Sequence, residues 1–93
     1  MTMQADALPG GDIIAQGMRD LASGVESDLS LLVSIGAPRL LRSGYVIPNP
    51  LGDPERRLYA RLAAVDSNAA HSRYNALIRR LVSFERASEC ANR

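Results

Sequence analysis

The stretch from Asp53 to Glu89 most constrains the fold, because it is the longest part of the chain with apolar residues at helical spacing. Asp53 is a suitable N-cap, and Pro54 suits the first helical position, where a backbone N–H has no partner in the helix anyway. A helix should therefore begin at Pro54. We expect the rest of the chain to pack against this stretch.

The apolar residues of this stretch change face partway along. One stripe comprises Leu58, Leu62, Val65 and Ala69, and a second, rotated by roughly 100°, comprises Ala70, Tyr74, Leu77, Leu81 and Phe84. The change falls at Asp66-Ser67-Asn68, whose side chains compete for backbone hydrogen bonds and prefer caps. Either one continuous helix presents two faces, which we favour, or the chain forms separate helices over 54–65 and 68–89.

An earlier segment, residues 13–35, has a second amphipathic pattern. Its apolar residues follow one another at intervals of three and four, which predicts one helix over this range with Asp12 as its N-cap. Gly36 is placed to end the helix in the left-handed conformation, and Pro38 to prevent its continuation.

Two glycines, Gly17 and Gly24, lie seven residues apart on a flank of this predicted helix. Small residues at such spacing allow another helix to approach closely. The alternative, which we favour, is that both glycines are tolerated on a solvent-facing surface, at a cost of about 1 kcal/mol each relative to alanine.

The connector over residues 36–52 is longer than most links within a compact domain, and it is apolar. Its large hydrophobic residues are Leu40, Leu41, Tyr45, Val46, Ile47 and Leu51. These side chains would be costly to leave exposed together. The connector should therefore either pack across the helices, which we favour, or serve as an interaction surface.

The composition supports a single all-α domain. The chain has 93 residues, of which 46% are hydrophobic but only 4% aromatic, so that its core must be mainly aliphatic, as in helix–helix packing. We predict a helical hairpin, or a three-helix domain if the last stretch breaks, over residues 12–93, preceded by a flexible tail over 1–11. Two helices bury little apolar surface, and we therefore also expect a homodimer.

Charge is unevenly distributed along the chain. Residues 1–36 contain five acidic residues and only one arginine, whereas the remainder contains five acidic residues and ten arginines. This asymmetry can guide docking of one half against the other, or the choice of a partner.

The sequence has no motif typical of a metal, cofactor or catalytic site. His71 and Cys90 are the only imidazole and thiol groups, and neither belongs to a recognisable metal-binding spacing. We predict no cofactor and favour a protein that is not an enzyme, although a small helical enzyme stays an alternative. A single cysteine indicates a reducing cytoplasm, and no apolar run approaches membrane-spanning length.

Arginines provide one candidate site in the last helix. They are Arg73, Arg79, Arg80 and Arg86, on the side predicted to face away from the second apolar stripe. Such a face could pair with the acidic N-terminal half, bind a partner protein, or bind an anion or nucleic acid. The interpretation that we favour is a solvated or intramolecularly paired face.

A related pattern is the recurrence of Asp66, Arg73 and Arg80 every seven residues, close to the line of the first apolar stripe. On a continuous helix these charges would flank a packed seam, where Arg and Asp of two copies could pair. We favour the simpler interpretation that this line faces solvent beyond Asp66.

Two short stretches resemble known families. NPLGDPE, residues 49–55, resembles the turn that opens the second helix in type III secretion needle subunits, and SRYNALIRRL, residues 72–81, is similar to part of TraM-type quorum-sensing antiactivators. The second resemblance implies a small helical dimer that occupies a partner protein. Neither stretch carries a diagnostic motif, and no functional residue is transferred from either family.

These observations predict a small protein–protein interaction module, such as a bacterial adaptor, chaperone or antiactivator. Its expected partner-binding residues are Tyr45, Ile47, Tyr74, Leu77, Leu81 and Phe84. Nucleic-acid binding through the arginines is the alternative.

Overall fold

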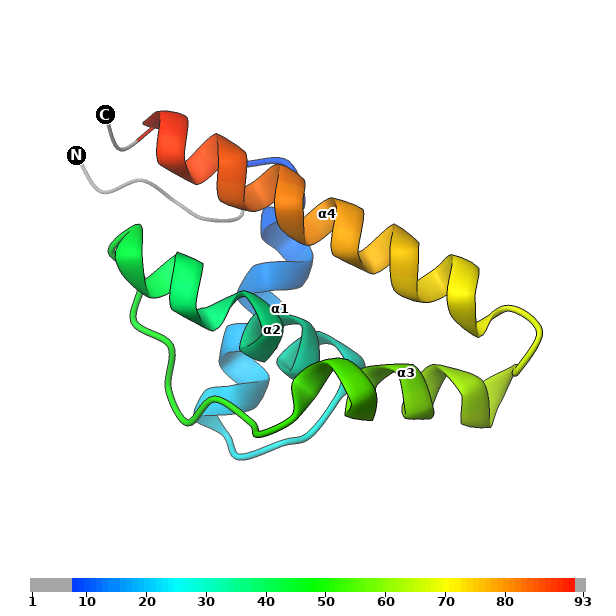
Figure 1. The fold of residues 1–93 in the computed structure, drawn as a ribbon. Coiled ribbons are helices and arrows are strands. Elements are labelled where there is room, and N and C mark those ends of the chain that lie inside the picture. Colours follow the sequence, from blue (N-terminus) through cyan, green and yellow to red (C-terminus); the bar gives the residue numbers. More distant parts are fainter. Residues whose placement is uncertain (1–7, 92–93) are drawn as a thin grey trace.

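The computed structural model describes residues 8–91, and this part of the chain is all-α, as predicted. Its helices are α1 (Gly11–Ala22), α2 (Asp28–Arg42), α3 (Pro54–Val65) and α4 (Ala70–Ala91). Figure 1 shows α3 and α4 as the two arms of a hairpin, with α1 and α2 packed at its open end. The domain is elongated, with extents of 43 × 25 × 18 Å.

The central element is α2, and not the stretch over 53–89 that we expected to organise the fold. This helix contacts all three others. Its buried apolar side chains are Leu31, Leu32, Val33, Ala37 and Leu40. They occupy several sides of α2, as expected for a helix that is covered by neighbours around much of its circumference.

The single helix predicted over 13–35 is wrong, because the chain turns between α1 and α2. Gly24 adopts a left-handed φ of 73°, which breaks the helix. Ser27 then caps α2: its Oγ accepts a hydrogen bond from the backbone N of Ser30 at 3.0 Å, and Ser30 Oγ accepts one from the backbone N of Ser27 at 2.7 Å. This reciprocal capping satisfies two backbone donors that the helix start would leave unpaired.

Gly17 is a close contact between α1 and α2, contrary to the interpretation that we favoured. A Cβ atom at this buried position would lie 2.4 Å from the carbonyl oxygen of Leu29 and 2.5 Å from Cγ2 of Val33. Around Gly24, by contrast, no atom lies within 4 Å of such a Cβ. The two glycines therefore have different roles, one in helix packing and one in a turn.

The predicted end of a helix at Gly36 is also wrong, since α2 continues through Gly36 and Pro38 to Arg42. Gly36 is buried where α2 crosses α4, and a Cβ there would lie 2.7 Å from Cδ1 of Leu81. Pro38 is exposed and removes one backbone hydrogen bond within the helix. Packing against the neighbouring helices outweighs both local signals.

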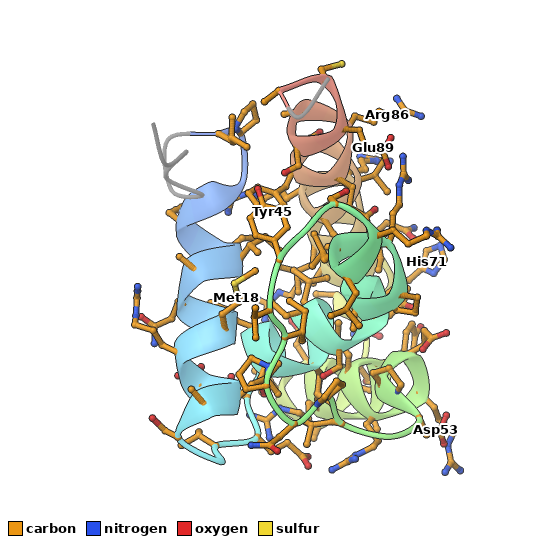
Figure 2. All side chains as sticks on the ribbon, turned by 90° about the vertical axis from the view of Figure 1, so that its left-hand side faces the viewer. Met18, Tyr45, Asp53, His71, Arg86 and Glu89 are labelled. Atoms are coloured by element: carbon orange, nitrogen blue, oxygen red, sulfur yellow. The ribbon has the colours of Figure 1, made fainter. Side chains whose placement is uncertain are left out.

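The connector is consequently shorter than predicted, at residues 43–53, and it packs on the helices in part, through Tyr45, Ile47 and Leu51, whereas Val46 is exposed. Ile47 is buried, and the ring of Tyr45 lies 5.5 Å from that of Phe84, centroid to centroid. The Tyr45 hydroxyl also lies 2.9 Å from Oγ of Ser88, within hydrogen-bonding distance. Figure 2 shows Tyr45 between α1 and α4. This residue thus fastens the connector to the C-terminal half of α4.

The chain breaks between α3 and α4, so that the continuous helix that we favoured is wrong and the alternative is confirmed. Asp66 Oδ1 accepts hydrogen bonds from the backbone N of Asn68 at 3.1 Å and of Ala69 at 3.3 Å. These bonds stabilise the tight turn, as expected of an Asx-type side chain.

At the start of α3 the helix begins at Pro54 as predicted, but Asp53 makes no side-chain capping bond. Its backbone is left-handed, with φ of 51°, and its carboxylate pairs with Arg56 at 2.6 Å.

Residues 8–11, which we expected to belong to a flexible tail, are part of the folded domain. Residues 1–7 lie outside the described residues. Leu8 packs against the core, Gly10 takes the N-cap position expected for Asp12, and α1 begins at Gly11. A Cβ on Gly10 would lie 2.7 Å from the carbonyl oxygen of Arg80, which shows how closely this segment approaches α4.

Candidate functional site

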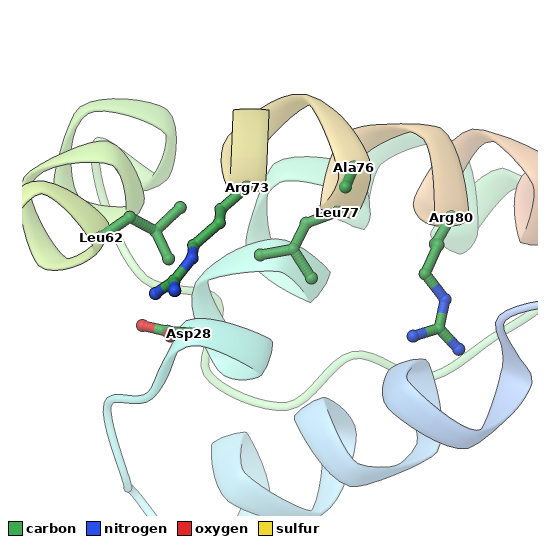
Figure 3. Close-up of a pocket in the computed structure, with 6 residues that line it drawn as sticks. All are labelled: Asp28, Leu62, Arg73, Ala76, Leu77 and Arg80. Atoms are coloured by element: carbon green, nitrogen blue, oxygen red, sulfur yellow. The ribbon is translucent and has the colours of Figure 1, made fainter. Parts of the chain in front are cut away.

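A groove of about 340 Å³ opens where the start of α2 faces α3 and the N-terminal half of α4. It is lined by Asp28, Leu62, Arg73, Ala76, Leu77 and Arg80. Figure 3 shows Leu77 pointing into the space between the two arginines, with Arg73 extending towards Leu62 and Asp28, and Arg80 towards α1. The groove therefore combines an apolar floor with a guanidinium group at either side.

Helical periodicity places the α4 residues of the groove together. Arg73, Leu77 and Arg80 are spaced by four and three residues, and side chains at these intervals lie on the same side of a helix. The seven-residue recurrence of Arg73 and Arg80 seen in the sequence thus marks one wall of the groove. Asp66, the third member of that pattern, lies in the turn before α4 and does not share this wall.

The charges at the groove are only partly compensated. Asp28 Oδ1 accepts a hydrogen bond from Nε of Arg61 at 2.8 Å, and Arg80 Nη2 lies 3.2 Å from Oδ1 of Asp12. Arg73 makes no ion pair and no side-chain hydrogen bond within residues 8–91. The groove therefore has a guanidinium group that forms no ion pair with the described part of the chain, although Asp28 lies in the same lining.

Three of the six predicted partner-binding residues are buried in the core of this chain. Ile47, Leu81 and Phe84 are 7%, 3% and 0% exposed. Half of the predicted surface is therefore covered by this chain itself. Tyr45 and Tyr74 are half-buried, and Leu77 is the predicted residue that reaches the groove.

The four predicted arginines do not form one face of α4. Arg79 and Arg86 lie roughly 120° around the helix from Arg73 and Arg80, as follows from about 100° per residue. All four side chains are exposed. The anion-binding face predicted from the sequence is thus divided, and two of its members face the groove.

Part of the basic half does pair with the acidic half, as the charge distribution predicted. The ion pairs that join them are Arg57–Glu26, Arg61–Asp28 and Arg80–Asp12. Exposed pairs of this kind each contribute little, typically less than about 1 kcal/mol. They help to set which surfaces meet, but the buried apolar residues hold the helices together.

A second cluster of charges lies between α2 and the end of α4, away from the groove. Glu85 is 5% exposed, and its Oε1 lies 3.5 Å from Nη1 of Arg39, which also binds Glu89. Burial raises the pKa of Glu85, because its charged form loses hydration there. The hydrogen bond to Glu89 raises the pKa of Arg39. This cluster fastens the two helices together.

His71 and Cys90 are both exposed. Nε2 of His71 lies 3.2 Å from Nδ2 of Asn75, and no three His, Cys, Asp or Glu residues within 8–91 are placed to hold a metal ion. Within the same range, none of the helices combines the length and apolar character needed to cross a membrane.

Sequence reasoning missed three of the groove residues. The sequence pattern indicates Leu62 only as part of an apolar stripe and Asp28 only as one of the acidic residues before residue 37, and it gives no signal for Ala76. Their juxtaposition depends on the break at Asp66, which folds α3 back along α4 and brings both against the start of α2. No local pattern in the sequence indicates that Asp28, Leu62 and Ala76, which belong to three different helices, lie close together.

Comparison of the chain with models of protein families, with curated proteins and with solved structures gave no match. The groove itself therefore provides the basis for a functional proposal.

Proposed function

We propose that this chain is a small protein-binding module and that a partner protein occupies the groove beside α4. One observation carries the proposal: Leu77 faces the groove next to Arg73, a cation without an ion-pair partner among residues 8–91. An accessible apolar side chain bordered by arginine is typical of protein interfaces, where arginine and large apolar groups supply much of the binding energy. Adaptor, chaperone and antiactivator functions all require such a surface.

Binding explains the groove better than catalysis. Its lining contains guanidinium, carboxylate and apolar groups, but no His, Cys or Ser side chain that could act as a nucleophile or as a general base near neutral pH. A helical enzyme would have to use the arginines and the carboxylate of Asp28, which is paired with Arg61, and it is the less supported alternative.

Nucleic-acid binding is supported by one observation, the exposure of Arg79 and Arg86 on the side of α4 away from the groove. Binding of this kind would weaken steeply with salt, and the substitutions Arg79→Ala and Arg86→Ala would abolish it. Filter binding with duplex and single-stranded DNA at low salt tests this alternative, and no retention there would exclude it.

A homodimer and a cytoplasmic location stay part of the proposal. The exposed thiol of Cys90 suits a reducing compartment, and the elongated shape of residues 8–91 leaves surface for a second copy. Light scattering over a range of concentrations determines the oligomeric state.

The proposal is tested by affinity capture from cells of the source organism, with the full chain as bait. The wild type is compared with Leu77→Glu, which places a charge in the groove, and with Arg79→Glu, which introduces the same side chain elsewhere on α4. We expect a partner that is captured by the wild type and by Arg79→Glu but is lost with Leu77→Glu. Equal capture by all three folded baits would contradict the proposal.

A further inference from the structure

We infer that the groove binds an acidic amphipathic helix of another protein, with two carboxylates seven residues apart and a large apolar side chain between them. This inference rests on the proposed function and specifies the chemistry of its partner.

The spacing of the ligand groups follows from α4. Arg73 and Arg80 are seven residues apart, which corresponds to about 10.5 Å along the helix axis. A second helix that lies alongside α4 has the same rise, so that its residues i and i+7 can face the two arginines. Residue i+3 or i+4 of that helix then faces Leu77 and the apolar floor.

The charge of the ligand follows from the ion pairs within the chain. Arg73 has no carboxylate partner among residues 8–91, and Arg80 pairs only with Asp12, whose side chain is 72% exposed. Both guanidinium groups can therefore donate hydrogen bonds to a carboxylate of a partner, and no buried interaction within the chain has to break. Paired hydrogen bonds from arginine to a carboxylate are among the stronger polar contacts in proteins.

The occupant is better supplied by another protein than by a second copy of this chain. Most carboxylates of the described residues are already paired with arginines of the same chain, at Asp12, Glu26, Asp28, Asp53, Glu85 and Glu89. Asp20, Glu55 and Asp66 have no such pair, but Asp20 accepts hydrogen bonds from Gln16 and Ser27, and no two of these three residues are seven apart in one helix. A second copy thus offers no helix with carboxylates at the required spacing.

The apolar floor distinguishes this ligand from a nucleic acid. A phosphate backbone would satisfy the arginines but would offer no apolar contact to the accessible surface of Ala76 and Leu77. An amphipathic helix satisfies both kinds of group, as in the helix-in-groove mode of recognition.

The inference is tested with a display library of helical peptides of about 18 residues, five turns of helix, randomised along one face. The full chain is the bait, and the double variant Arg73→Ala/Arg80→Ala is used for counter-selection. We expect selected peptides to carry Asp or Glu at two positions seven apart, with Leu, Ile, Met or Phe between them. Each single arginine substitution should weaken the binding of such a peptide by about tenfold or more, whereas Arg79→Ala should leave it unchanged.

NMR with the labelled full chain locates the peptide. Shift changes should centre on Leu62, Ala76 and Leu77. Selection of peptides without paired acidic residues, shift changes confined to another surface, or displacement of the peptide by a short DNA duplex would overturn the inference. A dimer in light scattering that is abolished by Arg73→Ala would assign the groove to a second copy instead.

The two proposals can fail separately. If a cellular partner is lost with Leu77→Glu while the selected peptides lack acidic residues, the protein-binding function stands and the acidic helix is wrong. If peptide binding behaves as expected but no cellular capture depends on Leu77, the chemistry of the groove is confirmed and the proposed function is contradicted.

Discussion

The carbonyl oxygen of Leu29 occupies the space that a side chain on Gly17 would need, 2.4 Å from the position of its Cβ. Because the obstructing atom belongs to the backbone of α2, a rotamer change cannot relieve the overlap. The short distance between α1 and α2 is thus possible only because residue 17 has no Cβ atom.

The substitution Gly17→Ala should therefore lower the free energy of unfolding by roughly 2 kcal/mol, as is typical of overpacked sites. Gly24→Ala, in open space but at a φ of 73°, should cost only about 1 kcal/mol. Urea denaturation of both variants tests this order. A Gly17→Ala protein as stable as the wild type would show that the two helices can separate without cost.

The hydroxyl of Tyr45 should stabilise the connector through its hydrogen bond with Ser88. Tyr45→Phe keeps the contact with the ring of Phe84 but removes this bond, so that we expect a loss of about 1 kcal/mol. Val46→Ala, at a neighbouring position that is 84% exposed, is the control and should change stability by less than about 0.5 kcal/mol. Equal stability of the two variants would contradict a role for the hydroxyl.

Removal of the Ser27 cap should destabilise α2 at its start. Ser27→Ala loses the bond from the backbone of Ser30 and the bond to Asp20 at 2.6 Å, and caps of this kind contribute about 1 kcal/mol. Ser72→Ala, at an exposed position within α4, serves as the control for loss of a hydroxyl. Thermal unfolding followed by circular dichroism at 222 nm, the usual helix band, measures the difference. An unchanged midpoint for Ser27→Ala would show that solvent replaces the cap.

The buried carboxyl group of Glu85 should make stability depend on pH. Its pKa is raised in the folded state, so that the folded chain binds this proton more tightly than the unfolded chain. Stability from this group is present at low pH and is lost as the pH rises through the folded pKa. Glu85→Gln, which stays neutral, should therefore be more stable than the wild type at pH 7.

This advantage should shrink as the pH falls towards 4.5, the ordinary pKa of the group, where the carboxyl becomes protonated in both states. Denaturation midpoints at a series of pH values test this behaviour. Glu55→Gln, at an exposed position, is the control. A Glu85→Gln protein that is less stable at pH 7 would show that attraction to Arg39 outweighs the cost of burial.

Local sequence signals predicted the parts of the fold that depend on local interactions. The all-α class and the start of α3 at Pro54 follow from periodicity and from the proline at the first helical position. The end of α3 near Val65 matches the alternative to the continuous helix that we favoured. The predictions at Gly24 and Gly36 are both wrong, one because a helix ends where we expected it to continue, and the other because a helix continues where we expected it to end. Gly24 breaks a helix that its apolar pattern continues, while Gly36 lies within a helix because α4 packs closely against it.

The groove was predictable only along α4. The recurrence of Arg73 and Arg80 on either side of Leu77 is visible in the sequence, and these residues do share one wall. Which apolar residues stay accessible depends on how the helices cross. Phe84 and Leu81 follow the same periodicity as Leu77, but the crossing of α2 and the connector bury them.

The buried residues of α4 are unevenly distributed, and this implies that its two ends open at different rates. Leu81, Phe84, Glu85 and Ser88 lie in the C-terminal half, whereas Ala70 is the buried residue of the other half. Amide hydrogen exchange should therefore be slow after Leu81 and faster around Arg73 and Leu77. A ligand in the groove would meet the more mobile half of α4, and its binding should extend slow exchange along the whole helix.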